Sequence, residues 1–224
     1  STTSGIQAGN GLVTISYSYP ACIGTPKTFT ITVNPTPVGS ASPQTICDET
    51  ASNIALNSTV TGTTYTWSAA IQTTPTGGTI TGFSDCASAC GTSIAQTLTN
   101  TGTTSGVVRY TVTPTANGCA GAPFTVDVTI NPTPNAVATP ASQTICSANA
   151  ISTIVLSGAV SGTTYAWTRD NTASATGIAA SGSGNISGNL TNTTNAPVTV
   201  TFTITPSANS CPGAAITATV LVNP

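Results

Sequence analysis

The sequence predicts an all-β protein built of tandem domains, and three observations support this. Apolar residues alternate with polar ones in several segments, as at Phe124, Val126, Val128 and Ile130, and a period of two is that of a strand with one buried face. Thr is the commonest residue, and β-branched side chains suit a pleated sheet. No segment shows the 3.6-residue period of an amphipathic helix.

Three copies of one pattern divide the chain. A strand-like run ending in Asn-Pro occurs at residues 29–35, 124–132 and 216–224. A period this long indicates whole domains in tandem rather than a solenoid of short units. We therefore expect a partial repeat that holds only the last two strands of a domain, followed by two complete domains, with bounds 1–37, 38–134 and 135–224.

Each complete domain has the features of an immunoglobulin-type β-sandwich, with a barrel as the alternative. It has roughly 90 to 100 residues, some seven short strands and an expected internal bridge. The junctions Asn34–Pro37 and Asn131–Pro134 are short and stiffened by proline, which favours a semi-rigid rod. Two strands alone are only marginally stable, so we expect either upstream repeats or another subunit to complete residues 1–37.

The composition excludes several functions. Only 4% of residues are charged and the net charge is −2, whereas about a quarter are charged in a typical soluble domain. Such a surface of Thr, Ser, Asn and Gly favours self-association or a glycan coat. Lys27, Arg109 and Arg169 are the only basic residues, too few to neutralise a nucleic acid. The apolar runs are too short for membrane insertion.

Cysteines predict disulfides and an oxidising, extracellular compartment. Cys47 and Cys146 each follow Gln-Thr-Ile, while Cys119 and Cys211 each follow an Asn-containing turn. We therefore expect one bridge within each domain, Cys47–Cys119 and Cys146–Cys211. Each would close a loop of roughly 70 residues and contribute about 4 kcal/mol in the chain-entropy model.

The remaining cysteines are Cys86 and Cys90, and Cys22, which matches Cys119 and Cys211 in the repeat but lies in the partial copy. Cys86 and Cys90 form a Cys-x-x-x-Cys pair in the first domain alone, which we interpret as a local loop staple. A zinc site needs four ligands, the chain has no His, and a redox motif would be Cys-x-x-Cys. Cys22 is expected to stay unpaired or to join a cysteine of another segment.

Trp67 and Trp167 are the only tryptophans and occupy equivalent positions. A tryptophan packed in the core is typical of this sandwich class, so we expect both to be core aromatics. The alternative is a platform on which a sugar ring stacks.

The acidic residues do not predict an active site. The five carboxylates are scattered, and none forms a calcium-loop motif or a recognisable acid–base pair. With no His and no activated cysteine, nucleophilic catalysis has no visible base. We expect no enzyme activity, no cofactor and no metal. Asn57, Asn185, Asn189 and Asn192 begin glycan acceptor motifs, so attached glycans are also considered.

The residues resemble a known repeat family. The runs concerned are Gln96–Thr104, Tyr110–Cys119 and Asn131–Pro134 in the first domain, and Ala179–Ile186 with Thr205–Asn209 in the second. They resemble the PKD-like repeats of Bacteroidota surface proteins, which include giant adhesins of gliding bacteria. The resemblance implies an immunoglobulin-like sandwich, secretion to the cell surface, many more repeats, and no catalytic residues.

These observations favour an extracellular structural repeat protein, either a segment of an adhesin shaft or a self-assembling filament. Its partners would be upstream repeats of the same chain or further copies of it. A glycan-binding accessory module of a secreted enzyme is the alternative.

Overall fold

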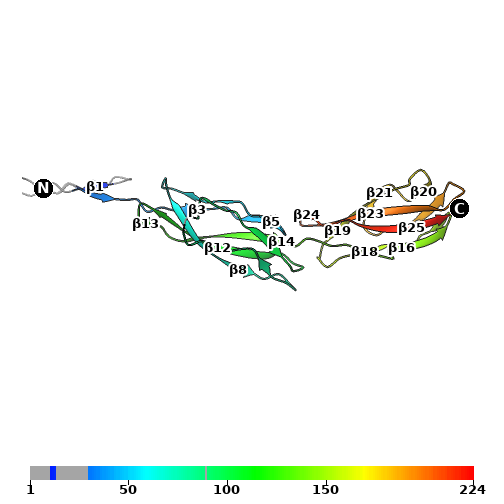
Figure 1. Ribbon diagram of the computed structural model, residues 1–224, viewed down its shortest axis with the longest axis horizontal. Helices are drawn as coiled ribbons and strands as arrows, with labels where there is room; N and C mark the ends of the chain where they lie inside the picture. The colour runs from blue at the N-terminus through cyan, green and yellow to red at the C-terminus, as the bar shows by residue number, and fades with distance from the viewer. Residues whose placement is uncertain (1–10, 14–29, 89) are drawn as a thin grey trace, which may run out of the picture.

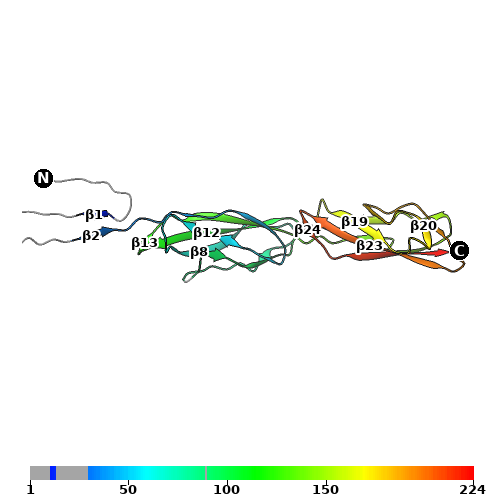
Figure 2. The same cartoon turned by 90° about the horizontal axis from the view of Figure 1, so that it is seen from above.

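The computed structural model describes residues 11–13, 30–88 and 90–224, and these form strands connected by loops and turns, with no helix. The described part of the chain is elongated, with its two complete domains end to end, the β1–β2 pair at one end and the carboxyl terminus at the other (Figures 1 and 2). None of the described residues belongs to a helix long and apolar enough to cross a membrane. In the expected partial repeat, β1 (Gly11–Val13) pairs antiparallel with β2 (Ile31–Val33), and Cys22 and Lys27 lie outside the described residues.

The first domain is a two-layer sandwich. One layer is a five-stranded sheet in which β12 pairs with β8 along one edge and with β13 and β14 along the other, while β14 pairs in parallel with β4. The strands of this sheet are β4 (Gln44–Cys47), β8 (Thr64–Thr73), β12 (Gly106–Ala116), β13 (Cys119–Ala120) and β14 (Phe124–Asn131).

Short strands form the opposite layer of the first domain. Three of them pair as β5-β11-β9, and the others pair as β10-β6 and β3-β7. These strands are β3 (Gly39–Ser40), β5 (Thr50–Ala51), β6 (Ile54–Ala55), β7 (Asn57–Ser58), β9 (Ile80–Thr81), β10 (Ser93–Ile94) and β11 (Thr97–Asn100).

The second domain repeats this plan. Its main sheet has the order β16-β25-β23-β19-β21 with β24 beside β23, and its other layer contains β17-β22-β20 and β15-β18. The main-sheet strands are β16 (Ser142–Cys146), β19 (Thr164–Arg169), β21 (Ser181–Ser183), β23 (Val198–Ala208), β24 (Cys211–Pro212) and β25 (Ile216–Asn223). The others are β15 (Val137–Thr139), β17 (Asn149–Ala150), β18 (Val155–Ser157), β20 (Ala175–Gly177) and β22 (Asn189–Asn192). Tandem immunoglobulin-like β-sandwiches are thus the fold of the chain.

The cores follow the alternation in the sequence. Val126, Val128 and Ile130 are buried on one face of β14, while the Thr and Asp residues between them are partly or fully exposed. Val200, Phe202 and Ile204 are likewise buried on one face of β23, and the Thr residues between them are partly or fully exposed. The strands of the second layer contribute the facing residues, such as Leu98 and Leu190, to the two core clusters.

A buried asparagine ties the last strand of each domain to its opposite layer. The Asn100 side-chain amide donates to the carbonyls of Thr104 and Ile130, at 3.0 and 2.8 Å. At the same place in the second domain, Asn192 donates to the carbonyls of Ala196 and Val222. Because a buried amide without partners costs free energy, these bonds fix the carboxyl end of β14 and of β25.

Tight turns end the long hairpins. Asn117 and Gly118 connect β12 to β13, and both have positive φ, 50° and 79°. Asn209 and Ser210 connect β23 to β24, with φ of 50° and 64°. Positive φ at both central residues is the pattern of a type I′ hairpin turn. These turns lie at the amino-terminal end of each domain, where the preceding repeat meets it.

Candidate functional site: the junction between the domains

A disulfide crosses the junction between the two domains. Cys47 at the end of β4 is bonded to Cys211 in β24, with the two Cα atoms 5.6 Å apart and 164 positions apart in the sequence. Both predicted intradomain bridges, Cys47–Cys119 and Cys146–Cys211, are therefore wrong. Cys119 and Cys146 carry free thiols, partly buried and exposed respectively.

The sheet geometry explains this correction. Cys47 pairs with Asn131 at the carboxyl end of β14, whereas Cys119 pairs with Ala116 at the opposite end of β12. About ten residues of β12 separate the two ends, which is roughly 33 Å at 3.3 Å per residue. Bridged cysteines have Cα atoms less than about 7 Å apart. Cys119 is therefore out of reach of Cys47, whereas Cys211 in the hairpin of the next domain is within reach.

Hydrogen bonds surround this bridge. The Asn131 side-chain amide donates to the carbonyl of Asn209 in the second domain at 3.4 Å, while the Ser105 hydroxyl donates to Asn131 Oδ1 at 2.7 Å. The backbone amide of Asp48 donates to the Asn131 carbonyl at 2.8 Å. Asn131 is 6% exposed and Cys211 is 1% exposed, so the junction is a packed interface.

The linker packs directly against the hairpin. A Cβ placed on Gly213 would lie 1.8 Å from the carbonyl oxygen of Pro134, so only glycine fits there. Pro132 and Pro134 are buried. The proline-stiffened linker and the disulfide therefore hold the two domains together at two separate points.

The preceding junction repeats this geometry. The Asn34 side-chain amide donates to the carbonyl of Asn117 at 3.1 Å, as Asn131 does to Asn209. A Cβ on Gly121 would lie 2.0 Å from the Pro37 carbonyl oxygen, as one on Gly213 would from Pro134. The same Asn-Pro-Thr-Pro segment thus docks on the same side of a hairpin twice.

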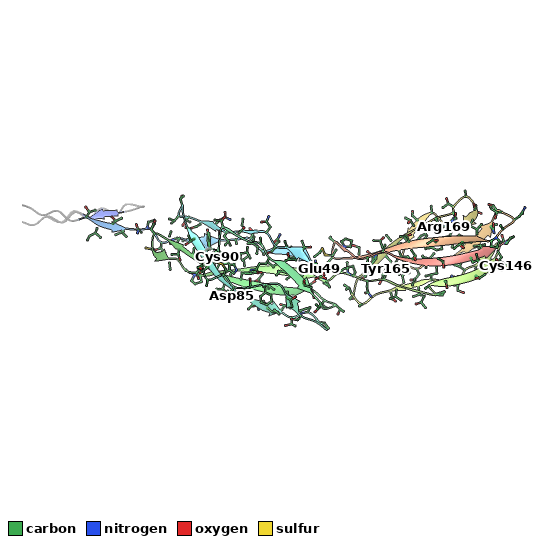
Figure 3. All side chains as sticks on the ribbon, viewed as in Figure 1. Glu49, Asp85, Cys90, Cys146, Tyr165 and Arg169 are labelled. Atoms are coloured by element: carbon green, nitrogen blue, oxygen red, sulfur yellow. A yellow bond between two sulfur atoms is a disulfide. The ribbon has the colours of Figure 1, made fainter. Side chains whose placement is uncertain are left out.

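The other predicted bridge lies within the first domain. Cys86 and Cys90 are joined, with Cα atoms 5.7 Å apart. The backbone amides of Cys86 and Trp67 donate to each other's carbonyls, at 2.8 and 2.9 Å, so this staple fixes the loop beside Trp67. Figure 3 shows Cys90 in the middle of the first domain and Cys146 at the far tip of the second.

Both tryptophans lie in the cores, each 8% exposed. Trp67 Nε1 donates to the Ser84 carbonyl at 3.2 Å, whereas Trp167 Nε1 is buried without a partner. Trp167 lines an open groove of about 390 Å³, together with residues that include Ile178, Gly182 and Asn185. Its walls carry no ionisable side chain.

The carboxylates mostly stabilise the backbone rather than facing solvent freely. Asp48, Asp85 and Asp170 each accept a hydrogen bond from a backbone amide, all at 2.7 Å. Asp127 pairs with Arg109 across two strands through two 2.8 Å hydrogen bonds. No group of three or more His, Cys, Asp or Glu side chains within the described part of the chain is placed to hold a metal ion.

The glycan acceptor motifs differ in accessibility. Asn57 and Asn189 are exposed. Asn192 is 8% exposed and its amide nitrogen already donates to two carbonyls, so this position is closed to a glycan in the folded protein. The Asn185 side-chain oxygen accepts a bond from the Leu156 amide.

The folds and the disulfide-linked junction define a tandem array of immunoglobulin-like sandwiches. The model of the PKD-like domain family matches residues 44–134 and 143–224, so the chain belongs to that family. Many cell-surface domains share this sandwich architecture.

Solved multidomain chains show a distant likeness. They include DIP-gamma IG1+IG2, with 9% identity, a TM-score of 0.40, and coverage of 84% of this chain and 97% of that one. Drosophila OTK extracellular domains 3–5 have 11% identity and a TM-score of 0.40, with coverage of 88% of this chain and 66% of that one. Clostridium thermocellum CbhA fibronectin(III)-like modules have 9% identity and a TM-score of 0.32, with coverage of 83% of this chain and 94% of that one. No curated protein matches the sequence significantly.

Proposed function

We propose that this chain is a load-bearing segment of an extracellular structural protein, either the shaft of a surface adhesin or a filament. The observation that carries the proposal is the Cys47–Cys211 bridge, which joins one domain to the next rather than stabilising either domain alone. A second covalent link at a junction restricts bending. Stiffness between domains is what a shaft needs and what an independent binding module does not need.

The strand arrangement also suits tension along the rod. The β1–β2 pair and the carboxyl terminus lie at opposite ends of the long axis (Figure 1), so a pull on the chain acts along the strands. In both domains the first and last strands of the main sheet pair in parallel, as β4 with β14 and β16 with β25. Pulling the two partners apart loads all their hydrogen bonds together, instead of opening them one at a time.

The chemistry of the surface supports a place outside the cell. Disulfides persist in oxidising compartments, and the described chain holds two of them. Only three basic residues offer trypsin a cleavage site, and Arg109 and Arg169 lie within paired strands. We expect the bonds after these two arginines to resist trypsin in the native protein.

Small-angle scattering of the oxidised full chain tests the proposal. We expect a rod whose inter-domain angle is narrowly distributed. The double variant Cys47→Ser/Cys211→Ser should give a broader distribution with both domains folded. The matched control Cys86→Ser/Cys90→Ser removes a bridge of the same kind inside one domain and should leave the angle unchanged. Equal flexibility in all three proteins would contradict a load-bearing junction.

A further inference from the structure

The carboxyl-terminal tip of the second domain is built like that of the first. Cys146 pairs with Asn223 in the parallel β16–β25 ladder, as Cys47 pairs with Asn131 in β4–β14. The buried Asn192 amide holds the Val222 carbonyl beside this tip. The cysteine, the paired asparagine and the buried asparagine amide beside the observed junction therefore all have equivalents at the second tip.

This second tip is uncovered. Cys146 is exposed and Asn223 is partly buried, whereas Cys47 is partly buried and Asn131 is buried. Cys146 lies at the end of the rod beside the carboxyl terminus (Figure 3). The differences in exposure correspond to what the docked hairpin covers at the first tip.

The complementary surface also recurs. Two hairpins, those at Asn117 and Asn209, each accept a bond from the asparagine of the preceding repeat. The glycine just beyond each hairpin, Gly121 or Gly213, admits the linker backbone. Docking of a tip on a hairpin is thus a repeated contact rather than a property of one pair of domains.

From this repetition, and resting on the proposed function, we infer that Cys146 is a covalent docking site for the hairpin cysteine of a following PKD-like repeat. That repeat sits on the tip of the second domain as the second domain sits on the first. Cys119 is the reciprocal half of the same bridge and takes the first-strand cysteine of a preceding repeat. The array is then linked by one disulfide at each junction.

Formation of the bridge is an oxidation. The two thiols lose two protons and two electrons as the S–S bond forms. A disulfide-containing oxidant, such as oxidised glutathione, accepts them and becomes two thiols. A repeat tethered by a short linker presents its cysteine at an effective concentration in the millimolar range, which favours this pairing over collisions between chains.

The test extends the full chain by its own second domain. Residues 133–224 are joined after Pro224, which restores an Asn-Pro-Thr-Pro junction, and the added copy carries Cys146→Ser. The protein is refolded with oxidised and reduced glutathione, and its disulfides are mapped by mass spectrometry after acid pepsin digestion. We expect a peptide that joins Cys146 to the hairpin cysteine of the added repeat, and loss of one alkylatable thiol per added repeat.

A second variant appends residues 36–134 instead, so that Cys119 supplies the hairpin thiol, and it should give the equivalent linkage. Far-UV circular dichroism per residue, unchanged from the parent, shows that an added repeat is folded. A folded added repeat with Cys146 still free would overturn the inference. So would a covalent Cys146–Cys119 dimer of the unextended chain, because it would make a second copy the occupant.

The native Cys47–Cys211 bridge is the internal control. If it forms while Cys146 stays free, the inference fails and the proposed function stands. If the native bridge is absent as well, the load-bearing junction itself fails.

Discussion

The two domains use the same pair of core aromatic positions differently. In the first domain, the Tyr110 hydroxyl donates a hydrogen bond to Gln96 at 2.8 Å and the Trp67 indole donates one to the Ser84 carbonyl. In the second domain the equivalent residues, Phe202 and Trp167, pack edge to face with their ring centroids 5.7 Å apart. The first domain also has a loop disulfide and the Arg109–Asp127 pair, and the second domain has neither. At their ends, however, the domains use the same asparagine, proline and glycine contacts. The domains therefore differ in these side-chain contacts, whereas the contacts at their junctions recur, as the proposed load-bearing role requires.

The largest expected effect on the free energy of unfolding distinguishes Cys47 from Cys146, its equivalent in the second domain. Cys47→Ser removes a bridge that closes a loop of 164 residues, for which the chain-entropy model gives about 5 kcal/mol of stability. Cys146→Ser removes a free, exposed thiol and should change the free energy of unfolding very little. Urea unfolding under non-reducing conditions measures both. Equal losses in the two variants would show that the bridge is not inter-domain.

The fold and the positions of the cysteines could be predicted from the sequence, but their pairing could not. The repeat frame correctly places Cys47 with Cys146 and Cys119 with Cys211 as equivalent residues. A frame of equivalent positions is satisfied equally well by bridges within a repeat and by bridges from one repeat to the next. The choice depends on which end of the sheet each cysteine occupies, and the parallel pairing of β4 with β14 sets this. No periodicity in the sequence reveals that pairing.

The hydrogen bonds and close contacts at the junctions could not be predicted from the sequence either. The proline-rich linkers predict stiffness. Nothing in the sequence, however, indicates that the side chain of Asn131 in the same segment donates a hydrogen bond to the Asn209 carbonyl. Gly121 and Gly213 occur at equivalent positions after Cys119 and Cys211. This repeated glycine is the sequence feature from which a close approach of the linker backbone could have been predicted. The core positions of the tryptophans, by contrast, could be predicted from their equivalent places in the two repeats and from the core tryptophan typical of this sandwich class.

The next prediction compares the two tryptophans. Trp67→Phe loses the hydrogen bond from Nε1 to the Ser84 carbonyl, whereas Trp167→Phe removes an indole nitrogen that has no partner. We expect Trp67→Phe to cost about 1 kcal/mol more than Trp167→Phe, the net contribution of one hydrogen bond. Each variant leaves one tryptophan, so fluorescence follows the other domain and circular dichroism follows both. A larger cost for Trp167→Phe would contradict the bonding described here.

The hairpin turns give an effect of similar size with opposite signs. Ser210 has φ of 64° where Gly118 has 79°, and a residue with a Cβ pays about 1 kcal/mol in this region. Ser210→Gly should therefore stabilise the second domain by up to that amount, while Gly118→Ser should destabilise the first. Urea unfolding is followed by fluorescence in a Trp67→Phe background for Ser210→Gly and in a Trp167→Phe background for Gly118→Ser, so that the one remaining tryptophan reports the altered domain. Destabilisation by Ser210→Gly would mean that the hydroxyl supports the turn.

The smallest expected effect concerns pH. The hydrogen bonds from Arg109 hold the pKa of Asp127 below its usual value, with the positive charge of Arg109 adding to this and partial burial opposing it. A carboxyl whose pKa is lowered by folding contributes stability above its unfolded pKa of about 3.9. That contribution disappears as the pH falls through the lower folded value. At the equivalent place the second domain has the uncharged pair Thr201 and Thr219, so it lacks this dependence.

Asp127→Asn should therefore slightly destabilise the first domain at pH 7 and leave its stability unchanged at the lowest pH where it still folds, because the native carboxyl is then protonated. The effect is small because both side chains are more than a third exposed, 40% for Arg109 and 35% for Asp127, and exposed pairs are screened by solvent and salt. Added salt should reduce the difference at pH 7. Thr219→Asn is the matched control in the second domain, and any effect it has should not vary between pH 3 and pH 7 as that of Asp127→Asn does.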